Sequence, residues 1–319
     1  MENWQRAIAV VRRYGPAMRF SYWIPNSLPW DATVAQARFA EQAGFDGIWY
    51  ADHFMPNAVE PADGPAHEAP TMLAALAAAT SRVRLGPLVY GNTYRNPAVM
   101  LKSAVTIDHI SNGRFVLGLG AGWQENEHRA YGVDFNTFRW RFDRLEEACK
   151  VITSLLAESR SSFSGAHYSL VDAPLDPKPV QSPLPILIGG GGEKRTLPIV
   201  ARYAHEWNVW GTPELLGQKG KVLDQCCERD GRDPASVTHS AVALLFMSED
   251  PAVLAKVRGM TIERPTVIGT PAEVAETMIA YRDAGVGEFI IPGFNFRSDG
   301  DREDVLGRFI AEVVPALNG

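Results

Sequence analysis

Short apolar segments alternate with longer segments of helical periodicity eight times along this chain. The apolar segments are rich in Val, Ile, Leu and aromatic residues, and several are unbroken, as expected of parallel strands covered on both faces. The predicted strands are residues 19–24, 47–51, 83–90, 115–119, 185–189, 206–210, 240–246 and 288–292. Eight strand–helix units predict a (β/α)8 TIM barrel, and a doubly wound open sheet is the second possibility.

The intervals between the strands contain helix signals and two insertions. Asp31 is expected to cap a helix that ends before Gly44, and a long helix is expected over residues 138–156. Charged side chains on that long helix, including Arg141, are expected to form a solvated or interlocking face.

Two further intervals, residues 159–184 and 247–270, are too long for plain loops. They predict insertions after the fourth helix and after the seventh strand. The barrel is expected to span residues 18–319 as a single domain, preceded by an N-terminal extension of residues 1–17.

Composition and charge exclude several classes of partner. The chain has 319 residues, 46% of them hydrophobic, and its net charge of −6 comes without a basic stripe, which argues against a nucleic-acid surface. No apolar run approaches the roughly twenty residues that span a bilayer. The three cysteines, Cys149, Cys226 and Cys227, have no metal-ligand spacing and favour a reducing cytoplasm. We therefore expect a cytoplasmic protein that binds a small molecule, with no metal, membrane or nucleic acid.

A glycine run follows the fifth predicted strand, where Ile188 is succeeded by Gly189, Gly190, Gly191, Gly192, Glu193, Lys194 and Arg195. Backbone N–H groups can approach an anion closely at glycine, and a following helix adds the positive end of its dipole. Lys194 and Arg195 are expected to add charge in the first helical turn. The run therefore predicts a phosphate site, and glycines that merely permit close packing are the alternative.

Aromatic and polar residues gather at the predicted strand ends, where barrel enzymes place their active sites. Trp23, Trp123 and Trp210 follow three of the strands and suit a flat ring ligand, although aromatic residues also cap barrel cores. His53 follows the second strand directly after Asp52. We predict a catalytic role for His53, with Asp52 setting its tautomer and orientation.

Several of these motifs together resemble the luciferase-like monooxygenase superfamily. The similar segments are residues 44–49 leading to Asp52-His53, Arg95-Asn96-Pro97, residues 111–123 and the glycine run. The resemblance covers residues 18 to about 317. The glycine run, followed by residues 201–204, is most similar to the actinobacterial branch that uses the deazaflavin coenzyme F420 in place of FMN.

The resemblance implies a barrel, usually a homodimer, that holds a flavin or deazaflavin ring at its C-terminal mouth. It implies a non-proline cis peptide at Leu88-Val89 behind the ring, and the phosphate group on Gly190 to Arg195. The residues implied to contact the coenzyme are Asp52, His53, Leu88, Val89, Asn92, Ala121, Gly122, Asn126, Gly189, Gly190, Gly191, Gly192, Glu193, Lys194 and Arg195.

The chain departs from the F420-dependent sugar-phosphate dehydrogenases of this superfamily at two positions. Trp123 replaces their carboxylic acid after the fourth strand, and Asn57 replaces their tryptophan shortly after the histidine. These residues, with Trp23 and Trp210, are the predicted substrate pocket. We therefore expect an apolar or aromatic substrate in place of a sugar phosphate.

The predicted activity is that of an F420-dependent oxidoreductase, which transfers a hydride between C5 of the deazaflavin and a small organic substrate. With FMN the enzyme would be a two-component monooxygenase. A non-catalytic F420 carrier is a third possibility, because it would keep the glycine run and the ring pocket. A phosphate-binding isomerase or aldolase is a fourth, but no strand-end lysine or evident carboxylate base supports it.

Overall fold

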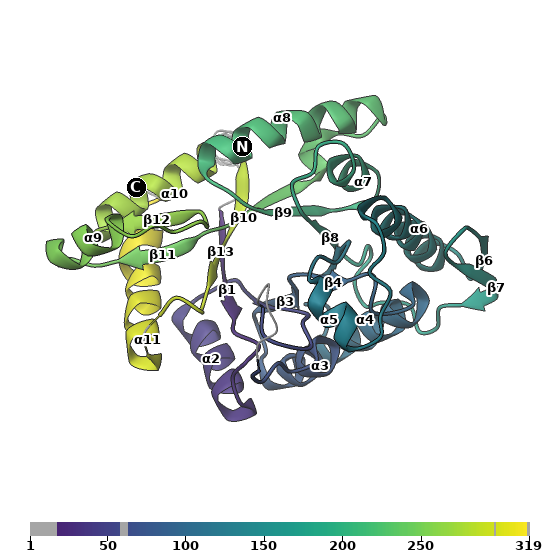
Figure 1. Cartoon of the computed structure of the whole chain (residues 1–319), viewed down its shortest axis with the longest axis horizontal. Helices are drawn as coiled ribbons and strands as arrows, with labels where there is room; N and C mark the ends of the chain where they lie inside the picture. Colours follow the sequence, from purple (N-terminus) through teal and green to yellow (C-terminus); the bar gives the residue numbers. More distant parts are fainter. Residues whose placement is uncertain (1–17, 58–62, 297, 318–319) are drawn as a thin grey trace, which may run out of the picture.

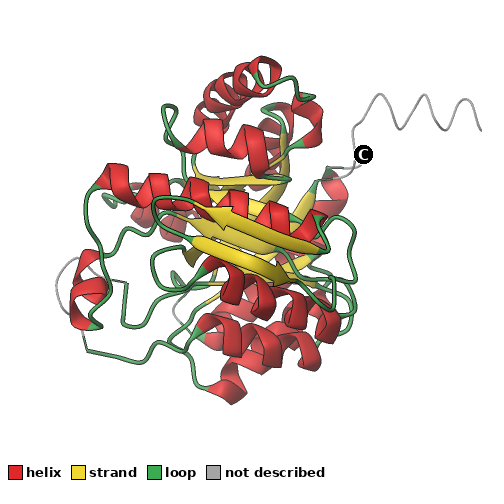
Figure 2. Ribbon diagram, turned by 90° about the vertical axis from the view of Figure 1, so that its right-hand side faces the viewer, coloured by secondary structure: helices red, strands yellow, loops and turns green. Residues whose placement is uncertain are grey.

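The computed structural model describes residues 18–57, 63–296 and 298–317 and has the predicted barrel architecture. The expected N-terminal extension, residues 1–17, lies outside the described residues. Strands form an inner ring, and helices surround it (Figure 1). Figure 2 shows helices above and below the strands. Each barrel strand therefore has helices against its outer face and the barrel interior against its inner face, which explains the unbroken apolar sequence.

The barrel strands are β1 (Arg19–Ile24), β2 (Gly47–Tyr50), β3 (Arg84–Pro87), β4 (Tyr90–Gly91), β5 (Leu117–Gly120), β8 (Ile186–Gly189), β9 (Glu206–Trp210), β10 (Thr238–Val242) and β13 (Val286–Pro292). Their order is β3–β2–β1–β13–β10–β9–β8–β5–β4, and all neighbours are parallel. The segments β3 and β4 belong to one barrel strand, because only the cis-linked residues Leu88 and Val89 separate them. A bridge from Leu85 to Phe115 joins β3 to the chain before β5 and helps to close the ring.

The helices are α2 (Trp30–Ala43), α3 (Ala69–Ala79), α4 (Pro97–Ser111), α5 (Glu125–Ala130), α6 (Phe138–Ala157), α7 (Thr196–Tyr203), α8 (Pro213–Arg229), α9 (Pro251–Arg258), α10 (Pro271–Asp283), α11 (Asp299–Arg308) and α12 (Val314–Ala316). A 3₁₀ turn (Pro234–Ser236) and a π-helical turn (Phe309–Val313) complete them. Within the described residues, none of these helices has both the length and the apolar character to cross a bilayer.

Strands outside the barrel lie within or next to the two predicted insertions. β6 (Arg160–Ser164) and β7 (Ser169–Pro174) form an antiparallel hairpin, and β11 (Leu244–Met247) pairs with β12 (Thr266–Gly269). They lie at opposite ends of the molecule in Figure 1. The prediction of one strand over residues 240–246 was wrong, since β10 stays in the barrel while β11 leaves it. An unbroken apolar sequence does not show where one strand ends and the next begins to pair with a different strand.

The start of α2 also differs from the prediction. Pro29 occupies the N-cap position without a side-chain hydrogen bond, and Asp31 lies inside the first turn. Asp31 is therefore not the cap, although its negative charge suits the positive end of the helix dipole. Gly44 ends the helix as predicted, with a φ of 108° in the left-handed region that favours glycine.

A buried carboxylate organises the N-terminal end of the barrel. Glu288 is fully buried and accepts hydrogen bonds from Ser21 Oγ at 2.6 Å and Trp49 Nε1 at 2.9 Å. Arg84 Nη1 donates to it at 2.7 Å, while Arg84 Nη2 donates to Glu206 at 2.5 Å. Burial acts to raise the pKa of Glu288, but the arginines and these hydrogen bonds hold it below its usual value. Through the carboxylates of Glu288 and Glu206, the cluster joins the five strands β1, β2, β3, β9 and β13.

Glu288→Gln should destabilise the fold by about 3–5 kcal/mol, because it breaks the buried ion pair with Arg84 and leaves that arginine with Glu206 alone. Urea unfolding followed by tryptophan fluorescence measures the change. Glu312→Gln is the matched control, since it removes a carboxylate from the exposed pair with Arg308 and should have a much smaller effect on stability. Equal effects of the two variants would contradict the role given to Glu288.

Candidate functional site

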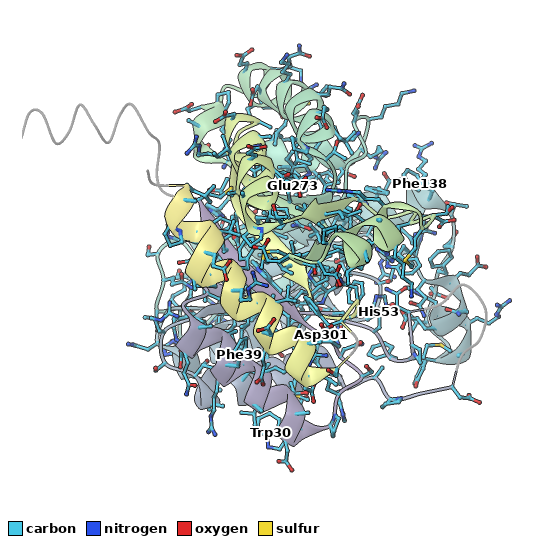
Figure 3. All side chains as sticks on the ribbon, turned by 90° about the vertical axis from the view of Figure 1, so that its left-hand side faces the viewer. Trp30, Phe39, His53, Phe138, Glu273 and Asp301 are labelled. Carbon is cyan, nitrogen blue, oxygen red and sulfur yellow. The ribbon has the colours of Figure 1, made fainter. Side chains whose placement is uncertain are left out.

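A cavity of about 740 Å³ opens at the C-terminal ends of the barrel strands. In Figure 3 the labelled lining residues His53 and Phe138 both lie toward the right-hand side, whereas Trp30 and Phe39 lie on α2 outside the barrel. The volume suits an organic molecule with several rings. The lining residues are Trp23, Asp52, His53, Asn57, Leu88, Val89, Tyr90, Gly91, Tyr94, Gly120, Ala121, Gly122, Trp123, Phe138, Arg141, Phe142, Gly189, Gly190, Gly191, Gly192, Thr196, Asn208, Val209, Trp210 and Arg264.

Val89 projects from the broken third strand against glycines of the next two strands. The Leu88–Val89 bond is cis, as the resemblance implied. A Cβ on Gly120 would lie 2.6 Å from Val89 Cγ2, and one on Gly189 would lie 3.1 Å from both Val89 methyl groups. The glycines thus leave the room that Val89 occupies, and Val89 forms part of the cavity wall.

Aromatic side chains form another part of the wall. Trp23 and Trp210 lie 5.9 Å apart between ring centroids, and Phe294 packs edge-on against Trp23 at 5.7 Å. Trp123 is 53% exposed and packs edge-on against His53 at 5.6 Å. All four residues predicted for the substrate pocket, Trp23, Asn57, Trp123 and Trp210, line the cavity.

His53 is oriented by Glu127 and not by the neighbouring Asp52. His53 Nδ1 lies 2.8 Å from Glu127 Oε1, and the Phe54 backbone N–H donates to Oε2 at 2.9 Å. The hydroxyl of Tyr94 also donates to Oε1. Burial acts to raise the pKa of Glu127, but these hydrogen bonds hold it below its usual value. An ionised Glu127 can only accept, so Nδ1 of His53 carries a proton and Nε2 is left for a ligand.

The prediction that Asp52 sets the tautomer of His53 was therefore wrong. Asp52 forms a two-pronged ion pair with Arg95 at 2.7 and 3.0 Å and accepts the Gly91 N–H at 3.0 Å. Adjacent residues at the end of a strand point in different directions, so proximity in sequence did not identify the partner. Burial raises the pKa of Asp52, and Arg95 counteracts this shift. Asp52 thus ties β2 to β4 beside the cavity.

The glycine run lines the cavity, and the backbone N–H groups that follow Gly190 are free. Gly189 to Gly192 line the cavity, and Gly190 has a φ of 119°, which favours glycine. Gly190 N–H bonds Asn208 O, but the N–H groups from Gly191 to Arg195 donate to no acceptor in the described part of the chain. Clustered free N–H groups at a helix start are suited to an anion.

The basic residues after the glycines differ from the prediction. α7 begins at Thr196, so Lys194 and Arg195 lie in the turn before the helix and not in its first turn. Arg195 forms an ion pair with Asp143 of α6, and Glu193 pairs with Lys219 at 3.2 Å. Lys194 is exposed, and none of Glu193, Lys194 and Arg195 lines the cavity.

Other predicted contact residues lie close to the cavity without lining it. Asn92 is fully buried and donates to the hydroxyl of Tyr168 at 3.3 Å, and Asn126 is buried in α5. Ala121 and Gly122 do line the cavity. Gly122 has a φ of 81°, and a Cβ there would lie 2.7 Å from Thr93 Oγ1.

Sequence reasoning missed Glu127, Tyr94, Arg141 and Arg264. From the segment Glu125-Asn126-Glu127-His128 the resemblance named only Asn126, as a coenzyme contact. The signal for Glu127 was its place in the first turn of a helix that follows a strand end. Its partner His53 is 74 residues away, so pairing required the fold.

Comparisons with known proteins agree with this geometry. The family model described as luciferase-like monooxygenase matches residues 18–260. An F420-dependent glucose-6-phosphate dehydrogenase of Kineococcus radiotolerans is 33% identical over 317 residues, covering 87% of this chain and 90% of the relative. An FMNH(2)-dependent dimethylsulfone monooxygenase of Pseudomonas putida is 24% identical over 357 residues, covering 94% and 96%.

Solved structures show the same fold at lower identity. An F420-dependent secondary alcohol dehydrogenase in complex with an F420–acetone adduct has a TM-score of 0.81 at 20% identity, covering 95% of this chain and 99% of that one. The coenzyme F420-dependent tetrahydromethanopterin reductase of Methanopyrus kandleri has a TM-score of 0.79 at 17% identity, covering 95% and 100%.

The low pKa of Glu127 predicts a pH-dependent contribution to stability. Its ionised form stabilises the fold above the unfolded pKa of about 4.3, and this contribution is lost as pH falls through the lower folded pKa. Glu127→Gln should therefore be less stable than wild type at neutral pH, with the difference shrinking below about pH 4.

Urea unfolding between pH 3 and pH 7 measures this dependence, and Glu125→Gln on the exposed side of α5 is the control. A stability difference between wild type and Glu127→Gln that does not change with pH would contradict the assignment.

Proposed function

The chain belongs to the luciferase-like monooxygenase family, and we propose that it is an F420-dependent oxidoreductase acting on a small apolar or aromatic substrate. One observation carries the proposal: the glycine run, with its free N–H groups, and the histidine held by Glu127 line the same aromatic cavity. The F420-dependent relative, at 33% identity, supports the choice of coenzyme.

The residues present fit a deazaflavin with a phosphate-bearing side chain. Val89 packs closely onto Gly120 and Gly189, and the wall formed in this way would support the ring. The free N–H groups of Gly191 and Gly192, which line the cavity, would hold the phosphate. When bound, F420 supplies a hydride donor or acceptor at C5, which is the chemistry that no protein side chain can provide.

His53 is the group that would move a proton during turnover. Its Nδ1 proton is held by Glu127, so Nε2 is the ring nitrogen available to a substrate oxygen. Oxidation of an alcohol releases a hydride from carbon and a proton from oxygen, and Nε2 would accept the proton. In the reverse direction the protonated ring would return it to the carbonyl oxygen. Burial of the glutamate keeps water from competing for this bond.

The aromatic wall favours an apolar substrate. Trp123 packs edge-on against His53, so an indole lies in the cavity wall beside the proposed proton carrier. Trp23 and Trp210 form another part of the wall, and rings of this kind bind flat apolar groups by burial and stacking. A sugar phosphate would leave its hydroxyl groups without partners on these surfaces.

The FMN-using relatives define the second candidate function, a two-component monooxygenase. The same cavity would then hold reduced FMN, and oxygen would be a substrate. Anaerobic assays with F420 and a panel of alcohols, ketones and activated alkenes, followed by the absorbance of oxidised F420, test the proposal. Turnover without oxygen is the expected result. Product formation only with reduced FMN and oxygen would reject the F420 proposal.

His53→Ala should lower the turnover number by about two to four orders of magnitude, because general acid–base catalysis contributes on that scale. The dissociation constant for F420 should change by less than about threefold. His109→Ala is the control, since His109 lies on the exposed side of α4. Full turnover in His53→Ala would reduce His53 to a structural residue.

A further inference from the structure

Arg141 is a buried cation in the cavity wall. It lies in the first turn of α6, and only 9% of it is exposed. Its guanidinium stacks over the ring of Phe135 at 3.7 Å, and Nη1 donates to the carbonyl oxygen of Asn136 at 2.8 Å. Its Nε is buried without a hydrogen-bond partner. Of the two expectations for the charged face of this helix, solvated or interlocking, Arg141 does not fit the solvated one, because this turn of α6 faces the cavity.

The positive charge of Arg141 has no counter-ion. No carboxylate in the described ranges lies within ion-pair distance of it, whereas the similarly buried Arg302 pairs with Asp299. Burial lowers the pKa of Arg141 and so opposes its charged form. An unpaired buried charge is costly, so its retention in a cavity wall indicates an anionic ligand.

Arg141 and the glycine run line one cavity. Gly190, Gly191, Gly192 and Thr196 are lining residues of the same cavity as Arg141 and its neighbour Phe142. The ion pair between Arg195 and Asp143 holds the turn after the glycines against α6. The free N–H groups and the unpaired guanidinium therefore border the same space.

We propose that Arg141, together with the N–H groups of the glycine run, forms the binding site for a phosphate ester, with Arg141 as its principal cation. The proposal rests on the proposed function, because it assigns the phosphate of the coenzyme to this site. A guanidinium presents parallel N–H donors that match two phosphate oxygens, which suits Arg141 better than a single ammonium.

The basic residues of the glycine run do not supply this charge. Asp143 balances Arg195, and the side chain of Lys194 is exposed outside the cavity. Lys219 reaches the run, but it donates to the carbonyl of Gly191 and pairs with Glu193. Within the described wall of the cavity, Arg264 is the other arginine, and it stacks on Trp210 at 4.5 Å, on the substrate side.

Fluorescence titration of two ligands tests the assignment: F420, and the deazaflavin chromophore that lacks the phosphate-bearing side chain. Arg141→Met should weaken F420 binding by about 10- to 100-fold, the range expected for hydrogen bonds to a charged group. Binding of the phosphate-free chromophore should change by less than about twofold. Arg141→Lys should recover part of the lost affinity.

Arg139→Met is the matched control, because Arg139 lies on the same helix, is 85% exposed and pairs with Asp143. It should leave both affinities unchanged. Thermal unfolding distinguishes a structural role: a ligand-binding Arg141 is replaced by Met with little loss of melting temperature in the free protein. Equal weakening of both ligands together with a lower melting temperature would overturn the proposal, as would unchanged F420 affinity.

The two proposals fail in different ways. If wild-type protein does not bind F420, the proposed function fails, and the same variants are then titrated with FMN and riboflavin. Selective loss of FMN affinity in Arg141→Met would still support the phosphate site. Unchanged affinity of Arg141→Met for both FMN and riboflavin would reject the phosphate site. Absence of FMN binding by the wild type would also reject it.

Discussion

The packing of Val89 onto glycines is the constraint on which the cavity depends. The third barrel strand breaks between β3 and β4, and the side chain of Val89 fills space that a Cβ on Gly120 or Gly189 would occupy. The same glycines end β5 and β8, so the strands can continue into open loops at the mouth. Close packing of this kind tolerates no added carbon, because interiors are packed as densely as crystals. The cavity therefore follows from where side chains are missing as much as from where they are present.

Buried charge divides the barrel into a structural end and a chemical end. At the N-terminal end Glu288 has a full set of donors and neutralises Arg84, which closes an ionic network inside the barrel. At the mouth Glu127 is equally satisfied, but one of its donors is His53, a residue that faces the cavity. Arg141 has no such partner. Buried charges with partners therefore stabilise the fold, whereas the unpaired charge of Arg141 is available to bind a ligand.

Periodicity in the sequence was sufficient for the barrel, because buried parallel strands leave a simple apolar pattern. It failed at residues 240–246, where β10 and β11 share one apolar run but belong to different sheets. The candidate site was harder to predict from the sequence. His53 and the glycine run can be recognised from neighbouring residues in the sequence. The roles of Glu127 and Arg141 depend on a partner distant in the chain or on the lack of a partner, which only the fold shows. Asp52 was predicted to bond His53 because the two are adjacent in the sequence, but in the fold it forms an ion pair with Arg95.

The most direct test of the proposed coenzyme is a side-by-side titration of the purified protein with F420 and FMN, each in both oxidation states, followed by ring fluorescence or absorbance. The proposed function predicts tight binding of F420 and weaker binding of FMN in both states. Preferential binding of FMN would place the protein among oxygen-using monooxygenases. Binding of neither would contradict the central claim that the glycine run and the aromatic wall form a deazaflavin site.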